Sequence, residues 1–220
     1  MKIIAGTTHH KLAKNIASEL KAEFIKPEVR KFNDGELSVN ITSDLRASEV
    51  VIVQSICSPT SDNLFELLSL IDIARRARAK DIITVIPYFG YSRSDSSIRL
   101  IANLLMSAGA DRIITIDLHS PGSCKFFKIP IINLSAADLF LPLIRAKPHV
   151  VIVSPDQGGL ARARKISDSL KCKLAVIVKE RTSPNSCRMT ELIGDVKGKY
   201  CVIIDDTSIP QALYAKLLNI

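Results

Sequence analysis

The sequence predicts an α/β protein built on doubly wound parallel sheets with helices packed against them. Two observations support this prediction. Seven short runs rich in isoleucine and valine recur along the chain without the strict alternation of a half-exposed strand, which is typical of strands buried on both faces. Helical patterns separate most of these runs, as in βαβ units. The 220 residues are enough for one large domain or two small ones.

Each element is expected from its own local pattern. The expected strands cover residues 2–5, 50–53, 82–86, 112–116, 150–153, 174–178 and 200–204. The first clear helical face runs from Leu64 to Ile71, with N-cap candidates at residues 60–63. A second helical face starts at Ile98 and is expected to end at Gly109, and a third helix covers residues 158–170.

One segment departs from this alternation of strands and helices. Residues 24–41 predict two short strands joined through Asn33-Asp34-Gly35, a strong hairpin signal. A mild boundary follows at residues 146–149, where Pro148 separates a helix from the next strand. We therefore expect two α/β domains, residues 1–147 and an incomplete second domain at residues 148–220.

Composition excludes several classes of protein. No apolar run is long enough to span a bilayer, and the N-terminus predicts a first strand rather than a signal peptide. The five cysteines form no CxxC pair and no metal-ligand spacing, which favours a reducing, cytoplasmic setting. The net charge of +8 is spread along the chain, and aromatic residues make up only 5% of it with no Trp, so nucleic-acid binding is not expected.

The residues that follow the expected strands carry the chemistry. Ligands bind outside the carboxyl ends of strands in open α/β sheets. Asp117-Leu-His119 follows the fourth strand, Ser154-Pro-Asp156 the fifth, Lys179-Glu-Arg181 the sixth and Asp205-Asp206 the seventh. We expect them to converge on one sheet edge that could hold Mg²⁺ through carboxylates and substrate phosphates, with the two cations balancing phosphate charge.

Each of these residues also has a purely structural interpretation, which the residues alone leave open. Asp156 stands before Gln-Gly-Gly and could simply cap the following helix. His119 could be a buried histidine satisfied by backbone groups. Lys179 and Arg181 could be a solvated strand end. The paired glycines at 158–159 allow close approach of an anion, but they match no complete phosphate-binding motif.

Several motifs, in one order along nearly the whole chain, resemble the ribose-phosphate pyrophosphokinase (PRPP synthetase) family. They lie at residues 32–36, 86–93, 108–112, 117–119, 154–156 and 193–196. The resemblance implies two phosphoribosyltransferase-like α/β domains, the second truncated here. It also implies transfer of diphosphate from ATP to ribose 5-phosphate with Mg²⁺, in homodimers that build larger oligomers.

The resemblance also implies roles for individual residues. Phe32, Asp34 and Glu36 match a hairpin that reaches the adenine bound by a neighbouring subunit, and Arg93 and Asp95 match the loop that binds ATP. His119 and Asp156 match residues associated with Mg²⁺. Lys179 and Arg181 match a catalytic loop that stabilises the transferred diphosphoryl group. Asp205 and Asp206 match the first residues of the loop that binds ribose 5-phosphate.

The sequence departs from the family pattern in two places. Ser94 replaces the usual Gln, and Ser96-Ser97 stand where basic residues are expected. The family's Asp-Asp-x-x-Asp-Thr-x-Gly-Thr is replaced by Asp-Asp-Thr-Ser-Ile-Pro-Gln-Ala-Leu at residues 205–213. Two interpretations follow: an active diphosphokinase, or a nucleotide-binding relative with weak or no activity that acts as a subunit or regulator. A phosphoribosyltransferase would need the same phosphate-binding residues.

Overall fold

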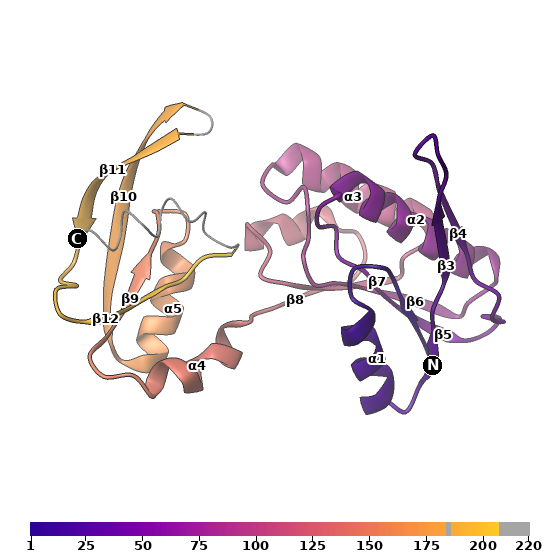
Figure 1. Ribbon diagram of the computed structural model, residues 1–220, viewed down its shortest axis with the longest axis horizontal. Coiled ribbons are helices and arrows are strands. Elements are labelled where there is room, and N and C mark those ends of the chain that lie inside the picture. Colours follow the sequence, from indigo (N-terminus) through magenta and orange to yellow (C-terminus); the bar gives the residue numbers. More distant parts are fainter. Residues whose placement is uncertain (184–185, 207–220) are drawn as a thin grey trace. The chain divides into compact units, whose positions relative to one another are not determined.

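The computed structural model describes residues 1–183 and 186–206, with the backbone alone at 179–183 and 186–190. The chain forms two compact units, Met1–Ser135 and a second that begins at Ala136 (Figure 1). Each unit has its own sheet and its own hydrophobic core. No helix among the described residues is long and apolar enough to cross a membrane.

The first unit is built on a six-stranded sheet in which every neighbouring pair of strands is parallel. Its strands are β1 (Lys2–Ala5), β2 (Glu23–Ile25), β5 (Glu49–Val53), β6 (Asp81–Ile86), β7 (Arg112–Ile116) and β8 (Ile131–Leu134). They lie in the order β2-β1-β5-β6-β7-β8, so the direction of winding reverses between β1 and β5. This reversal confirms the doubly wound sheet expected from the sequence.

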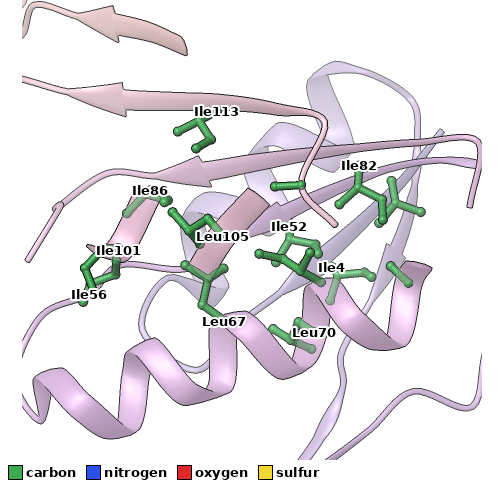
Figure 2. Packing of buried hydrophobic residues seen from close by; sticks show 14 of the residues in the cluster. Ile4, Ile52, Ile56, Leu67, Leu70, Ile82, Ile86, Ile101, Leu105 and Ile113 are labelled. Atoms are coloured by element: carbon green, nitrogen blue, oxygen red, sulfur yellow. The ribbon is translucent and has the colours of Figure 1, made fainter. Parts of the chain in front are cut away.

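Helices cover both faces of this sheet because consecutive strand residues point to opposite sides. Ile3 packs in the cluster of α1 (His10–Glu19) with Ala13. Its neighbour Ile4 packs in the larger cluster with Leu67 of α2 (Thr60–Arg76) and Leu105 of α3 (Asp95–Ala108). Figure 2 shows this second layer of buried aliphatic side chains between the sheet and its helices. The short 3-10 helix η1 (Pro121–Phe126) lies beside α3.

The helix ends test two of the sequence expectations. Gly109 caps α3 in the left-handed conformation with φ +115°, as predicted. The prediction of an N-cap within residues 60–63 is wrong: Thr60 is already helical, Pro59 is the cap residue, and no side chain bonds there.

A separate two-stranded sheet forms the predicted hairpin. Its strands are β3 (Glu28–Lys31) and β4 (Leu37–Asn40), and the turn between them has Gly35 at φ +94°. The prediction placed Phe24 and Ile25 in this hairpin, and that is wrong. Both residues belong to β2, where they pair in parallel with β1, and Ile25 is buried in the main core.

The second unit is built on a four-stranded sheet in the order β11-β10-β9-β12. Its elements are α4 (Ala137–Arg145), β9 (Val150–Ser154), α5 (Leu160–Leu170), β10 (Lys173–Ser183), β11 (Ser186–Ile193) and β12 (Tyr200–Ile203). The strands β10, β9 and β12 are parallel, whereas β11 runs antiparallel to β10. Helices α4 and α5 share one hydrophobic cluster with one face of the sheet.

The position of α4 differs from the expected domain organisation. The sequence placed a boundary at residue 147, after this helix, whereas the two compact units divide between Ser135 and Ala136. Ile144 of α4 packs with Ile152 of β9 and Ile166 of α5. The apolar face of α4 is therefore used within the second unit, a contact that local composition does not reveal.

Candidate functional site

An acidic site lies at the carboxyl ends of β9 and β12. The two strands pair in parallel, from Tyr200 with Val150 to Ile203 with Val153. The ladder extends one residue further, because the N–H of Ile204 donates to the carbonyl of Val153 at 3.0 Å. The residues that follow, Asp156 after β9 and the pair at 205–206 after β12, therefore reach the same edge of this sheet.

Asp156 is held by the turn that starts α5. Its Oδ1 accepts a hydrogen bond from the N–H of Gly159 at 2.9 Å, and its carbonyl accepts one from the hydroxyl of Ser154 at 2.7 Å. The cap residue of α5 is Gly159, and no side chain bonds at that cap, so the prediction that Asp156 caps the helix is wrong. The structural role of Asp156 is to close the turn before the helix. It does not exclude a ligand role, because a carboxylate has several lone pairs on two oxygens.

The paired aspartates influence each other strongly. The N–H of Asp206 donates to Oδ1 of Asp205 at 2.9 Å. The pKa of Asp205 is raised to about 6, first because burial disfavours the charged carboxylate, and then because of a hydrogen bond with Asp206 and the negative charges of Asp206 and Asp156. Arg162 of α5 lies 3.8 Å from Asp206, measured from its guanidinium nitrogen to Oδ1. The edge thus gathers three carboxylates and a guanidinium.

Hard carboxylate oxygens at this edge fit Mg²⁺, and a cation there would offset their mutual repulsion. Among the described residues, no group of three or more His, Cys, Asp and Glu side chains is arranged to hold a metal ion. Mg²⁺ commonly binds through one or two carboxylates, substrate phosphates and water. The donor set therefore fits a magnesium ion that arrives with a phosphorylated ligand.

The two expected catalytic cations lie in a longer strand than predicted. The sequence ended the sixth strand at Val178, but β10 continues through Ser183. Lys179 pairs with Met189 and Arg181 with Cys187 of the antiparallel strand β11. The extension comes from this partner strand, which the sequence analysis missed. The side chains of Lys179 and Arg181 lie outside the described part of the structure.

His119 lies in the first unit, just beyond β7. The N–H of Asp117 donates to the carbonyl of Leu134 at 2.9 Å, and the N–H of Leu118 donates to Oδ1 of Asn133 at 3.1 Å, which fixes this turn to β8. Leu118 is buried while His119 is exposed. The alternative that His119 is a buried core histidine is therefore wrong.

The expectation that all strand-end residues share one sheet edge is also wrong. His119 follows β7 of the six-stranded sheet, whereas Asp156 and Asp205 follow strands of the four-stranded sheet. The runs of apolar residues predict strands but not which sheet each strand joins. The structure brings Asp156, Asp205 and Asp206 together within the second unit.

Arg93 lies in the loop before α3 and Asp95 at the start of that helix, and both are exposed. The backbone of the loop is anchored where the N–H of Tyr88 donates to the hydroxyl of Ser55 at 2.9 Å. Asp95 is the first residue of α3 and forms an exposed ion pair with Lys125 at 3.9 Å. Both residues therefore stand at the carboxyl edge of the first sheet, where a ligand could reach them.

The hairpin tip presents an aromatic ring and two carboxylates to solvent. Phe32 is 57% exposed, and Asp34 and Glu36 are exposed beside it. Oδ1 of Asp34 accepts the N–H of Glu36 at 3.1 Å, which shapes the turn. At its base, the ammonium group of Lys31 lies 2.5 Å from the carboxylate of Asp62 at the start of α2. The exposed ring contributes little to the core, which is consistent with a role in binding.

Sequence reasoning missed a buried polar network between β1, β5 and α2. Glu66 is only 2% exposed, and it accepts hydrogen bonds from the N–H of Thr7, the hydroxyl of Thr7 and the side-chain amide of Gln54. Nearby, Nε2 of His9 lies 2.7 Å from the hydroxyl of Ser55, and burial lowers the pKa of this histidine. The signal that could have found the network is its place, just beyond β1 and β5, where the strand order reverses.

Comparison with known proteins places both units in one family. Residues 1–109 match the N-terminal domain of ribose phosphate pyrophosphokinase, and residues 125–208 match the phosphoribosyl transferase domain. Ribose-phosphate pyrophosphokinases of Chromobacterium violaceum and Clostridium perfringens are 41% and 43% identical to 94% of this chain, which covers 66% and 69% of their lengths. The chain thus spans about two thirds of these curated relatives.

The fold agrees with this similarity. The crystal structure of phosphoribosylpyrophosphate synthetase from Mycobacterium smegmatis superimposes with a TM-score of 0.87 at 34% sequence identity. The match covers 100% of this chain and 75% of the other. The α/β fold with phosphoribosyltransferase-like domains, expected from the sequence, is therefore confirmed.

Proposed function

This chain belongs to the ribose-phosphate pyrophosphokinase family, and from that premise we propose that it transfers the diphosphoryl group of ATP to ribose 5-phosphate, giving PRPP and AMP. The observation that carries the proposal is the identity of about 41% to enzymes of that name over 94% of the chain. This similarity favours the diphosphokinase over an inactive nucleotide-binding relative.

The acidic edge of the second unit is the proposed ribose site. Asp205 and Asp206 would accept hydrogen bonds from the ribose hydroxyls, since ionised carboxylates are strong acceptors. Neutral sugar hydroxyls are better partners for closely spaced carboxylates than another anion would be. Residues 207–213, where the sequence departs from the family pattern for the 5-phosphate loop, lie outside the described residues.

Magnesium is the proposed cofactor, and Asp156 is the proposed ligand at the acidic edge of the second unit. His119, in the first unit, stays a prediction from the family motif. When bound, the ion would neutralise charge on the ATP phosphates. Lys179 and Arg181 would stabilise the negative charge of the diphosphoryl group during transfer. Arg93 and Asp95 would bind ATP from the first unit. The proposal for these six residues rests on the family motifs.

The hairpin tip is the proposed contact to adenine in a neighbouring subunit. Phe32 offers a ring for stacking, while Asp34 and Glu36 offer acceptors for the amino group. Exposure of all three residues supports the proposal, because a tip turned toward solvent can enter a site on a second copy. We therefore propose a homodimer or a larger homo-oligomer.

A coupled assay for AMP and PRPP from Mg-ATP and ribose 5-phosphate tests the proposed function. The purified protein should form both products in equal amounts, and Asp206→Asn should lower kcat/KM for ribose 5-phosphate by about tenfold or more, because a charged acceptor is lost. His119→Ala serves as a check against a contaminating enzyme, whose activity would survive that change. Absence of AMP formation at saturating substrates would refute the proposal.

A further inference from the structure

We propose that Arg162 is a positioning residue of the ribose site, which fixes the carboxylate of Asp206 in the orientation that receives the sugar hydroxyls. The inference rests on the proposed function of that site. It assigns a role to a residue that belongs to none of the sequence motifs. The starting observation is the contact between Arg162 of α5 and Asp206, which follows β12.

The contact is not an ordinary surface ion pair. The Arg162 side chain is 20% exposed and that of Asp206 only 10%. In the surface ion pair between Arg76 and Asp72, by comparison, the side chains are 69% and 53% exposed. Solvent screens exposed pairs almost completely, but it screens partly buried pairs much less. The charge of Arg162 is therefore felt at Asp206.

The fold brings Arg162 to this place through the turn after β9. Asp156 and Gly159 close that turn, α5 begins at Leu160, and Arg162 is its third residue. The next residue, Ala163, is buried against the sheet, which fixes the rotation of the helix. From this position the side chain of Arg162 reaches Asp206, which follows β12, the parallel neighbour of β9.

The charges at the edge explain why a cation is needed there. Three carboxylates influence one another, since the charges of Asp206 and Asp156 both act on Asp205. A guanidinium beside Asp206 offsets part of this negative charge, and by the proposal it restricts rotation of the carboxylate. At 3.8 Å the contact is an ion pair without hydrogen-bond geometry, so it acts through charge and a lysine could partly replace it.

The test compares three variants, Arg162→Gln, Arg162→Lys and Arg164→Gln. Arg164 is the matched control, because it lies on the same helix two residues away and is exposed. Circular dichroism first verifies that each variant is folded. Three-bond NMR couplings of Asp206 then report its χ1 angle without any ligand, and calorimetry measures the affinities for ribose 5-phosphate and for Mg-ADP.

We expect Arg162→Gln to average the χ1 couplings of Asp206 and to weaken ribose 5-phosphate binding about tenfold, with Mg-ADP affinity unchanged. Arg162→Lys should restore both properties in part, and Arg164→Gln should match the wild type. A single Asp206 rotamer in Arg162→Gln, or equal losses for both ligands, would overturn the inference.

The two proposals fail in different ways. If the wild-type protein binds no ribose 5-phosphate, the proposed function fails. The NMR couplings still decide whether Arg162 fixes Asp206, because they need no ligand.

Discussion

Replacing Asp205 with Asn should stabilise the protein at neutral and alkaline pH. The pKa of Asp205 is about 6 in the folded protein and 3.8 in the reference state for an unfolded chain. Between these values the native state binds more protons than the unfolded state, so stability falls as pH rises through this window and stays reduced above it. Asn cannot ionise, and its carbonyl can still accept the N–H of Asp206.

The size of the effect follows from the shift. Each pKa unit corresponds to about 1.4 kcal/mol, and solvent screening reduces the effect at this partly buried group. The charged Asp205 therefore lowers stability by about 1–3 kcal/mol at pH 8 and by much less at pH 4. Urea unfolding followed by circular dichroism at both pH values measures the difference. The matched control Asp168→Asn, an exposed position on α5, should change stability by less than about 0.5 kcal/mol. A destabilised Asp205→Asn at pH 8, or an equal gain at both pH values, would refute the reasoning.

Two further substitutions separate folding from binding. Glu66→Ala should destabilise the protein by about 3 kcal/mol in the same urea experiment, because the buried amide of Gln54 and the two donors of Thr7 lose their acceptor. Its control is Asp72→Ala, an exposed position on the same helix, and an equal effect of both changes would contradict the role of the network. Phe32→Ala should leave stability within about 0.5 kcal/mol but weaken Mg-ATP binding about tenfold in calorimetry. Unchanged nucleotide affinity would remove Phe32 from the proposed adenine site.

Much of the fold could be predicted because buried parallel strands have a distinctive composition. All seven expected strands are present, with ends that differ by a few residues. The strands β8 and β11 were missed and β2 was misplaced in the hairpin; all three lie at sheet edges. The start of α2 at Thr60 was misjudged because Pro59, rather than a side-chain cap, precedes its first turn.

The candidate site could be predicted only in part. The positions of Asp156, Asp205 and Asp206 after apolar runs correctly predicted that they are neighbours, because the carboxyl ends of parallel strands meet at one edge. The assignment of strands to two sheets depends on pairings between distant segments, so the separation of His119 from Asp156 could not be read from local pattern. Arg162 could not be identified for the same reason, because α5, β10, β11 and β12 separate it from Asp206 in the sequence.

The hydrogen bond between Asp156 and Gly159 has a consequence for how tightly this edge can bind a ligand. Immobilising a flexible side chain on binding typically opposes association by about 0.5–1.5 kcal/mol. One oxygen of Asp156 is already fixed by the N–H of Gly159, so rotation of this carboxylate was restricted when the chain folded. The entropy of this side chain is therefore lost during folding and not during binding. A weakly bound, exchangeable ligand then binds to a carboxylate that is already ordered.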